Sequence, residues 1–419
     1  MAATSKRFPR RAAALTKEAV EDTRVVTING ARQSGKSTLA ASLLDQRPNS
    51  IAYYLDDEAT RAAAVSDPVG FIRHDGLMLI DEIQRVPELI LAIKHRVDMD
   101  DSPGQFILTG SAHLLGLSSL PDSLPGRSET IELWPLSQGE IEETRDDFID
   151  AVFTHGAALR VPPSTDHRLD YVERALRGGF PEAVRRSDQR RRNRFFDSYV
   201  TDLINRDILR ISDVDRPSDL RRILNTVAAQ MAGLLVPQRL SNDLALPAST
   251  LKRYLNLLEL VYLIRRIPAW APNLTARATA TPKLIVTDSG IAGRLAGWTL
   301  AKAANITAPV GPYIENLVLS ELARQVTWSE TGVQLFHFRT RNGMEVDAVL
   351  EGADGSVVGI EVKAAESLRA DDFKGLRYLA KQLGPRFRAG FVLYCGQRSL
   401  PFGNRLTGLP ISALWNAEV

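Results

Sequence analysis

The segment Gly30–Ser37 constrains the fold of this chain more than any other feature. It reads GARQSGKS and completes a G-x-x-x-x-G-K-[ST] pattern, with the apolar run Val25–Ile28 before it and the helix-like stretch Ser37–Leu44 after it. In such a strand–loop–helix unit, glycines let backbone N–H groups close around phosphate oxygens, and the positive end of the helix dipole faces them. The context favours a phosphate-binding loop over a chance glycine-rich turn and predicts an α/β domain.

The residue types in this loop match the needs of a bound nucleoside triphosphate. Lys36 would neutralise charge on the β- and γ-phosphates, and the Ser37 hydroxyl would be a ligand of Mg²⁺. We therefore expect Mg²⁺-ATP as the cofactor, with ATP and ADP as partners. The residues expected to surround the nucleotide are Gly30, Ala31, Arg32, Gln33, Ser34, Gly35, Lys36, Ser37 and Thr38.

Two further segments place polar residues at the ends of predicted strands. The apolar run Leu77–Ile80 ends in Asp81 and Glu82, and open α/β sheets bind ligands at the carboxyl ends of their strands. Asp81 would help to hold Mg²⁺, and Glu82 would be the general base for the attacking water. The alternative is an ordinary acidic pair at a helix start. The run Phe106–Leu108 ends in Thr109, which would sense the γ-phosphate.

Arg127 is a candidate for a catalytic cation. It follows Leu124-Pro125-Gly126 and would stabilise charge in the transition state, either in its own subunit or across a subunit boundary. The spacing favours this role no more than that of a surface arginine. A homo-oligomer therefore stays open at this point.

Composition is typical of soluble globular proteins. Hydrophobic residues make up 44% and charged residues 24%, and no apolar run approaches the roughly 18 residues that span a bilayer. The basic N-terminus lacks the apolar region of a secretory signal. The single cysteine, Cys395, excludes an internal disulfide and a cysteine-based metal site. We expect a cytoplasmic protein with no membrane partner, and the net charge of +2 does not by itself indicate nucleic-acid binding.

From about residue 140 to residue 270 the pattern becomes helical. Ser249, two residues after Pro247, is a plausible N-cap. The order helix, turn, helix, strand resembles a winged helix-turn-helix. The expected elements are helices at Arg190–Ile211, Asp219–Met231, Ser241–Leu246 and Ser249–Leu260, and a strand at Val261–Ile267.

The helix Ser249–Leu260 is the candidate recognition helix of this module. It presents Thr250, Lys252, Arg253 and Asn256 among apolar residues. In a helix-turn-helix the second helix enters the major groove, where such side chains reach bases or phosphates. DNA binding and a purely internal packing role are equally compatible with this pattern.

The last third of the chain carries a second set of carboxylates. Alternate residues of a strand share a face, so Glu361 and Lys363 point the same way. Asp347 lies on the preceding strand, and Glu315 lies on a helix before both. Such groups can converge on a hard divalent cation, with Glu345 as a competing ligand; the alternative is an exposed Glu/Lys ion pair. The expected elements are helices at Tyr313–Val326 and Asp371–Leu383, and strands at Gln334–Phe338, Glu345–Leu350, Val357–Val362 and Phe391–Tyr394.

Several segments resemble prokaryotic AAA-type (ASCE P-loop) ATPases that carry a C-terminal domain of unknown function. The resemblance implies a sheet in which the strand ending in Thr109 lies between the P-loop strand and the Asp81 strand. It also implies a helical lid or winged-helix middle and a nuclease-like C-terminal domain. The segments are TINGARQSGKSTL, LMLIDEIQRVPEL, FILTGSAHLL, LPGRSETIELWPLS, LRGGFPEAV and PKLIVTDSGIAGRL.

The C-terminal carboxylates resemble the PD-(D/E)XK nuclease core. The resemblance implies that Asp347 and Glu361 bind a second Mg²⁺ or a Mn²⁺, that Lys363 positions or activates the water, and that Glu315 completes the site. The metal would polarise the scissile phosphate. One departure is that Val346, rather than a proline, precedes Asp347.

Together these features predict an α/β protein with three domains. They are a P-loop AAA-type ATPase domain at residues 1–140, a helical lid and winged-helix domain at 141–280, and a restriction-endonuclease-like domain at 281–419. The favoured function is a Mg²⁺-dependent ATPase coupled to binding of nucleic acid, DNA rather than RNA, with metal-dependent phosphodiester cleavage. The alternative is a nucleotide-switched regulatory or interaction protein whose nuclease-like domain is catalytically inert.

Overall fold

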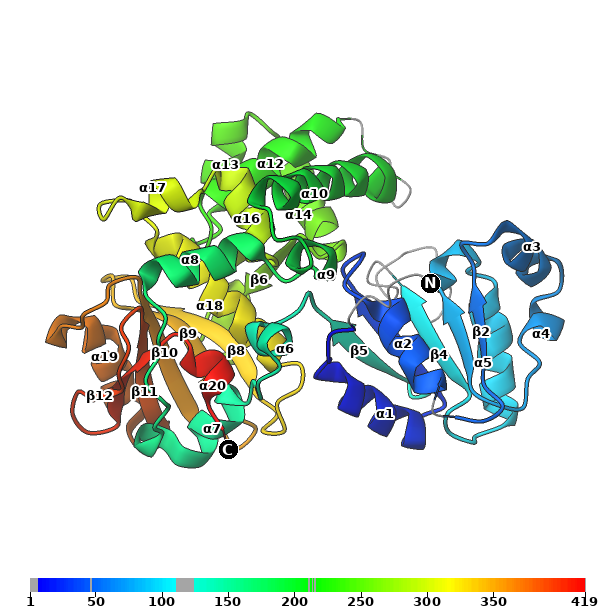
Figure 1. Cartoon of the computed structure of the whole chain (residues 1–419), viewed down its shortest axis with the longest axis horizontal. Coiled ribbons are helices and arrows are strands. Elements are labelled where there is room, and N and C mark those ends of the chain that lie inside the picture. Colours follow the sequence, from blue (N-terminus) through cyan, green and yellow to red (C-terminus); the bar gives the residue numbers. More distant parts are fainter. Residues whose placement is uncertain are drawn as a thin grey trace. The chain divides into compact units, whose positions relative to one another are not determined.

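The computed structural model describes residues 7–45, 47–110, 124–209, 212, 214 and 216–418. Its chain forms two compact units. The first consists of Met1–Leu136 with Leu260–Tyr262, and the second of Ser137–Glu259 with Leu263–Val419. Each unit is drawn with its element labels in Figure 1.

A parallel sheet organises the first unit. Its described strands lie in the order β2-β3-β4-β1-β5, and all of the pairings are parallel. β4 lies between β1 and β3, which confirms the strand order expected from the sequence. The strands are β1 (Val25–Gly30), β2 (Ile51–Tyr54), β3 (Met78–Asp81), β4 (Phe106–Gly110) and β5 (Ser128–Leu133).

Helices cover both faces of this sheet (Figure 1). Because successive strand residues alternate between faces, Ile80 packs into one hydrophobic cluster with α5, and Leu79 packs into another with α1 and α2. A parallel sheet buried on both faces explains why its strands are nearly continuous apolar runs. The helices are α1 (Ala12–Asp22), α2 (Lys36–Leu44), α3 (Glu58–Ser66), α4 (Pro68–Phe71), η1 (Ile83–Arg85) and α5 (Leu89–Met99).

Gly30 ends β1 at a point where the neighbouring strand approaches closely. A Cβ atom at this position would lie 2.1 Å from the carbonyl oxygen of Leu133 in β5. Only glycine fits without a shift of the backbone. The chain then turns through Gly35, whose φ of +102° is strained for other residues, into α2.

The first half of the second unit is helical. Residues expected to form one long helix from Arg190 instead form an α-helix to Asp202 and then a π-helical segment. The prediction of Ser249 as an N-cap was wrong: α14 already begins at Ala248, and the carbonyl of Pro247 accepts the N–H of Leu251. The elements are α6 (Gln138–Glu142), α7 (Phe148–His155), η3 (Gly156–Ala158), α8 (Arg168–Arg177), α9 (Pro181–Val184), α10 (Gln189–Asp202), η4 (Leu203–Ile208), α12 (Pro217–Ala229), α13 (Pro237–Leu244) and α14 (Ala248–Leu260).

A mixed sheet forms the second half of this unit. Its described strands lie in the order β12-β13-β11-β10-β9-β8; β8, β9 and β10 pair antiparallel, and β10, β11 and β13 pair parallel. A separate pair joins β6 (Ile264–Ile267) to β7 (Lys283–Val286). The strands are β8 (Gln334–Arg339), β9 (Glu345–Glu351), β10 (Val357–Lys363), β11 (Phe387–Tyr394), β12 (Leu400–Pro401) and β13 (Leu406–Pro410).

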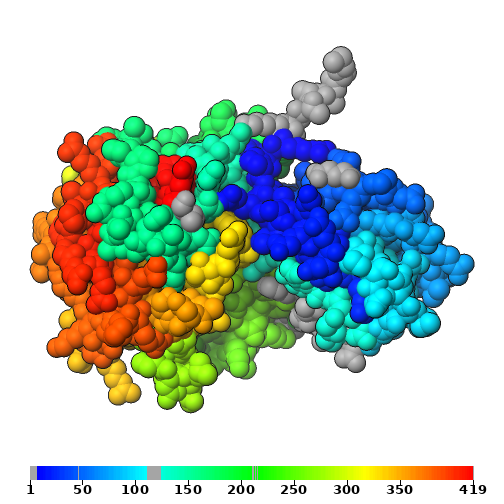
Figure 2. All heavy atoms as spheres, turned by 90° about the horizontal axis from the view of Figure 1, so that it is seen from below, coloured from blue at the N-terminus to red at the C-terminus, as the bar shows by residue number. Residues whose placement is uncertain are grey.

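Segments far apart in the sequence pack together within the second unit. Figure 2 shows the segment near residue 150 beside the C-terminal strands. Arg388 donates to the carbonyl of Thr154 at 3.0 Å, and Thr407 donates to that of Ala157 at 3.3 Å. The remaining elements are α15 (Leu274–Thr279), α16 (Ser289–Ala296), α17 (Leu300–Ala304), α18 (Gly311–Gln325), η5 (Ala370–Phe373), α19 (Lys374–Leu383), η6 (Gly384–Arg386) and α20 (Ala413–Asn416).

Helix α18 carries a row of buried polar side chains that tie the unit together. Asn316 accepts the N–H of Val286 at 2.9 Å and donates to its carbonyl at 3.0 Å, which fixes β7 to α18. Glu321 accepts the N–H of Gln138 at 3.0 Å and forms an ion pair with Arg324. The expected boundary between residues 280 and 281 therefore lies inside one compact unit, and the three-domain division stays a prediction.

Candidate nucleotide site and carboxylate cluster

The loop between β1 and α2 places Lys36 where the sequence predicts a phosphate site. Lys36 is 4% exposed, and its Nζ donates to the carbonyls of Gly30 at 3.1 Å and Ala31 at 2.9 Å. Gln33 has a left-handed φ of 60°. The other residues of the expected nucleotide site, which are Arg32, Ser34, Gly35, Ser37 and Thr38, lie in this loop or in the first turn of α2.

Three segments meet at the side chain of Asp81. Ser37 Oγ donates to Asp81 Oδ1 at 2.7 Å, and Thr109 Oγ1 donates to the same oxygen at 2.5 Å. They meet because β1, β3 and β4 are parallel, so their carboxyl ends share one edge of the sheet. The structure thus brings together the hydroxyl and carboxylate oxygens that Mg²⁺ prefers as ligands.

Glu82 lies next to this network in a conformation that is uncommon for its residue type. Its backbone is left-handed (φ 58°, ψ 46°), and its N–H donates to Thr109 Oγ1 at 3.1 Å. Gln84 donates to one of its carboxylate oxygens. Burial raises the pKa of Glu82, Lys36 opposes this shift, and Asp81 adds to it. A carboxylate with a raised pKa is better suited to accept a proton from water.

Arg127 is not brought to the loop of its own chain. It lies at the start of β5, where its carbonyl accepts the N–H of Val25 at 3.3 Å and its side chain pairs with Asp98. Val25 opens β1, whereas the loop follows the other end, roughly 16 Å further along the strand. Both expected roles of Arg127, within its own subunit and across a subunit boundary, stay predictions.

Arg10 contacts the loop although the motif does not include it. Its Nη1 donates to the carbonyl of Ser34 and its Nη2 to the carbonyl of Trp134, both at 2.6 Å. With the Ser34 carbonyl turned toward Arg10, the Gly35 N–H of the same peptide unit faces the opposite way. The only signal for this contact in the sequence was the basic character of the N-terminus.

In the second unit the structure brings the expected carboxylates together. Asp347 on β9 is 7% exposed, and its Oδ2 accepts the N–H of Val362 from β10 at 2.9 Å. Lys363 Nζ donates to Glu361 Oε1 at 2.8 Å. Glu361 Oε2 is buried and has no hydrogen-bond partner among the described residues.

A lysine that sequence reasoning missed lies among these groups. Lys283 opens β7, and its side chain is 2% exposed. Its Nζ lies 2.5 Å from Glu315 Oε1, 2.9 Å from Asp347 Oδ1 and 3.2 Å from Glu345 Oε1. An ammonium group thus lies beside Asp347, at the position where the sequence predicts a metal, and the metal site stays a prediction.

Burial and mutual repulsion set the protonation of this carboxylate cluster. Burial and the charge of Asp347 raise the pKa of Glu315 to about 8 and that of Glu361 to about 7. Burial alone would lower the pKa of Lys283, but Asp347 and Glu315 outweigh it and raise that pKa above its usual value. In the part of the chain that the structure describes, no group of three or more His, Cys, Asp or Glu side chains is arranged to hold a metal ion.

His337 on β8 gives the second unit a predicted sensitivity to acid. It is 1% exposed, its Nε2 lies 3.0 Å from the carbonyl of Thr281, and burial lowers its pKa to about 4. Between pH 6.5 and pH 4 the unfolded chain binds a proton here that the folded chain does not, so stability falls as the pH falls. At pH 4 the loss should be on the order of 3 kcal/mol.

The measurement is urea unfolding of the wild type and of His337→Gln between pH 7 and pH 4. The variant should lose less stability over this range, because glutamine can keep the donor to Thr281 without titrating. His155→Gln, an exposed histidine of the same unit, should behave like the wild type. An equal pH dependence for His337→Gln would contradict the prediction.

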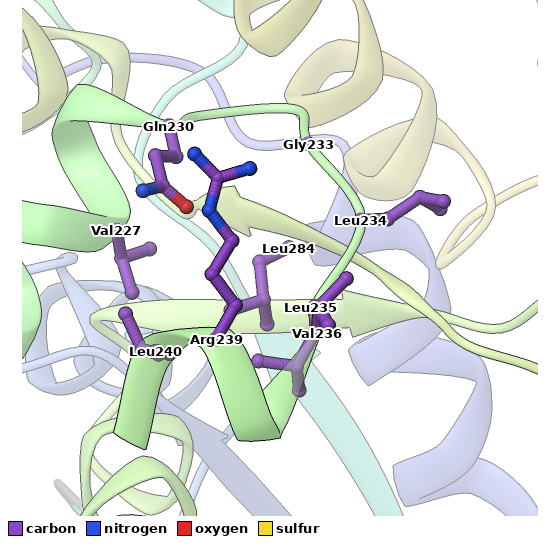
Figure 3. A pocket seen from close by; sticks show the side chains of 9 residues that line it. All are labelled: Val227, Gln230, Gly233, Leu234, Leu235, Val236, Arg239, Leu240 and Leu284. Atoms are coloured by element: carbon purple, nitrogen blue, oxygen red, sulfur yellow. The ribbon is translucent and has the colours of Figure 1, made fainter. Parts of the chain in front are cut away.

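A small cavity is lined by residues of α12, α13 and β7 (Figure 3). Its lining includes Val227 of α12, Arg239 and Leu240 of α13, and Leu284 of β7, next to Gln230. Its volume is about 50 Å³, whereas small-molecule sites usually enclose roughly 300–1,000 Å³. A nucleotide does not fit there.

Three segments of the chain match known families. Residues 22–142 match the AAA domain family, residues 168–302 a domain of unknown function (DUF8612), and residues 310–414 another (DUF4143). With the geometry above, the first match defines residues 22–142 as an AAA-type P-loop ATPase domain. The other two assign no activity, so the winged-helix and nuclease-like folds stay predictions.

Relatives of the chain extend over nearly its whole length. An uncharacterized protein of Mycobacterium tuberculosis, Rv2008c, is 27% identical over 404 residues, which are 96% of this chain and 83% of that protein. The uncharacterized protein Mb2031c of Mycobacterium bovis matches to the same extent. The segment order is therefore shared by whole proteins.

Two solved structures show more distant likenesses. A Walker-type ATPase of Pyrococcus abyssi is 18% identical, with 70% of this chain and 97% of that chain covered and a TM-score of 0.42. The RuvB Holliday junction branch migration motor of Thermotoga maritima is 23% identical, with 61% and 87% covered and a TM-score of 0.28. At these TM-scores neither structure adds to what the geometry of the nucleotide site shows.

None of the helices in the described part of the chain has both the length and the apolar character that a membrane-spanning helix needs.

Proposed function

We propose that this protein is a Mg²⁺-dependent ATPase whose turnover is coupled to the binding of nucleic acid, DNA rather than RNA. The observation that carries the proposal is the network that joins Ser37, Asp81 and Thr109, with Glu82 beside it. This network brings oxygen ligands for a cation to one edge of the sheet, next to a carboxylate that can accept a proton from a water molecule.

Each residue of the nucleotide site then has a task. Lys36 and the backbone N–H groups of the loop bind the phosphates, and Ser37 and Asp81 would hold Mg²⁺, which when bound neutralises charge on the β- and γ-phosphates. Glu82 accepts a proton from the attacking water. Thr109, which contacts both Asp81 and Glu82, positions the two carboxylates relative to each other and senses the γ-phosphate.

Arg127 completes this proposal in an oligomer. Because it lies at the opposite end of β1 from the loop, we favour a role at the nucleotide of a neighbouring subunit over one in its own. Its present partner, Asp98, would release it when that neighbour docks. A guanidinium beside the γ-phosphate stabilises charge in the transition state.

Helix α14 supports the nucleic-acid part of the proposal. Lys252, Arg253 and Asn256 are exposed on it, whereas Leu251 and Leu255 are buried. The pair β6 and β7 follows this helix, as the wing of a winged helix-turn-helix would. Exposed cations on such a helix neutralise DNA phosphates.

A second function is favoured by the position of Lys283. The ammonium group engages Asp347, which the nuclease interpretation assigns to the metal, and Glu315, which it assigns to complete the site. This contact favours a nucleotide-switched regulatory or interaction protein with an inert nuclease-like domain. Under the first function, Asp347 and Glu361 would bind a second Mg²⁺ or Mn²⁺ and Lys363 would activate water for phosphodiester cleavage.

One set of assays separates the two functions. ATP hydrolysis is measured with and without duplex DNA, single-stranded DNA and RNA, for the wild type and for a variant with both Lys252→Ala and Arg253→Ala. Under the first function, DNA increases the turnover of the wild type several-fold and leaves that of the variant unchanged. A variant with Lys374→Ala and Lys381→Ala, two exposed lysines of α19, is the control with the same loss of charge.

The outcomes against each function are distinct. Turnover that no nucleic acid changes would support the regulatory function. Cleavage of DNA by the wild type with Mg²⁺, lost in Asp347→Ala and in Lys363→Ala, would exclude an inert domain. A wild type that neither binds nor hydrolyses ATP would overturn the proposal as a whole.

A further inference from the structure

The environment of Lys283 is unusual for a lysine. Its ammonium group is buried, and three carboxylates, from Glu315, Glu345 and Asp347, lie within 3.2 Å of it. They come from α18 and β9, whereas Lys283 comes from β7. Lys283 therefore supplies a positive charge that lets these partly buried carboxylates approach one another, and Arg339 adds a second at Glu345, 3.0 Å from its Oε2.

A divalent cation does not fit beside Asp347 while Lys283 is there. Oδ1 of Asp347 is engaged by Lys283, and Oδ2 accepts the N–H of Val362 at 2.9 Å. A bound Mg²⁺ or Mn²⁺ would need these oxygens at about 2.0–2.2 Å and would be repelled by the adjacent ammonium. The carboxylate oxygens would suit a hard cation, but the ammonium group of Lys283 already occupies the position between them.

We propose that the ammonium group of Lys283 is the resident cation of this carboxylate cluster and takes the place of a divalent metal. The inference rests on the second proposed function, in which the nuclease-like domain is catalytically inert, and goes beyond it by naming the occupant of the site. It is incompatible with the metal-dependent cleavage of the first function. The wild-type cluster binds no divalent cation. The carboxylates as they now lie form no metal site, so in the absence of the ammonium we expect them to rearrange around a divalent cation.

The cation also links two parts of the second unit. Lys283 belongs to β7, which pairs with β6, while its partners lie on the elements that form the mixed sheet and its covering helix. A metal would need no contribution from β7. With Lys283 as the cation, the ammonium reaches Glu315, Glu345 and Asp347 only when β7 is docked, so the site serves cohesion of the unit rather than chemistry.

The test is Mn²⁺ binding by the full-length chain without nucleotide, followed by the loss of the free Mn²⁺ signal in electron paramagnetic resonance. All proteins carry Asp81→Asn, which removes the carboxylate of the nucleotide site. We expect no Mn²⁺ binding with Lys283 present. Lys283→Met should bind Mn²⁺ at one site at least about tenfold more tightly than the protein with Lys283, because Glu315 Oε1, Glu345 Oε1 and Asp347 Oδ1 then lose the ammonium that engages them.

Matched variants identify the origin of the binding. Lys283→Arg keeps the charge and should bind no Mn²⁺, and Asp347→Asn added to Lys283→Met should abolish the gained site. If Lys283→Met does not fold alone, Lys283→Met with Glu315→Gln removes one uncompensated charge and leaves Glu345, Asp347 and Glu361. Mn²⁺ should also raise the melting temperature of the methionine variant and not that of the protein with Lys283.

Two results would overturn the inference. One is that the protein with Lys283 binds Mn²⁺ and that Asp347→Asn abolishes this binding, since the metal would then coexist with the lysine. The other is a folded methionine variant that binds no Mn²⁺, because the cluster would then not be of a metal-binding kind. Neither result bears on ATP hydrolysis, which is measured with Asp81 intact.

Discussion

Replacement of Glu82 by glutamine is expected to lower the rate of ATP hydrolysis by about 10²–10⁴-fold. Glutamine keeps the size and the hydrogen-bonding capacity of the side chain but cannot accept a proton from water. The affinity for ATP should change little, because in the proposed site Lys36, Ser37 and Asp81 hold the nucleotide and its Mg²⁺. Single-turnover hydrolysis and equilibrium binding of a fluorescent ATP analogue measure the two quantities separately.

Two further variants make this result interpretable. Glu88→Gln removes the same charge from an exposed position just before α5 and should leave hydrolysis unchanged. Lys36→Ala should instead weaken nucleotide binding, because the charge that faces the phosphates is lost. If Glu82→Gln hydrolyses ATP at the rate of the wild type, another group must activate the water.

Replacement of Arg324 by methionine is expected to destabilise the second unit by about 3–5 kcal/mol. Arg324 is 2% exposed and Glu321 is fully buried, so the variant leaves a carboxylate without its cation in the interior. Arg324 also donates to the carbonyl of Thr287 at 3.2 Å, next to β7. Urea unfolding at neutral pH measures the free energy.

The surface offers a control with the same spacing. Arg185 and Glu182 form an ion pair between residues three apart on the second unit, but both side chains are substantially exposed. Arg185→Met should therefore cost less than about 1 kcal/mol. A double variant, Glu321→Gln with Arg324→Met, should recover part of the lost stability because the Glu321 carboxylate is no longer left without its cation. Similar losses for Arg324→Met and Arg185→Met would contradict the buried-charge argument.

The first unit was predictable because its signals are local. The strands β1, β3 and β4 were expected within two residues of their ends, since each is a short apolar run that stops at a polar residue. Asp81 and Thr109 stand at those stops, and Ser37 follows β1 as the second residue of α2. Parallel pairing then brings them to one edge without further information, although pairing order came from the resemblance rather than from the residues.

The second unit was less predictable because its decisive contacts are distant in sequence. Lys283 reads as the first residue of an apolar strand, and its partners Glu315 and Asp347 follow 32 and 64 residues later. β13 was missed because Leu406–Pro410 contains glycine and proline, which are rare within strands. The contact of Arg10 with Trp134 was also missed, because the two residues are 124 positions apart in the sequence.

The order of strands in the first unit also has a consequence for synthesis. β1 emerges early from the ribosome, but its two neighbours are β4 and β5, which place Val25 opposite Phe106 and Ser128. Pairing strands across such long loops is slow, because the conformational entropy of the connecting chain is lost before any stabilising contact forms. We therefore expect the loop that follows β1 to be held in shape only after β5, which ends at Leu133, has been made, so that a nascent chain binds ATP only once the sheet that supports the site has closed.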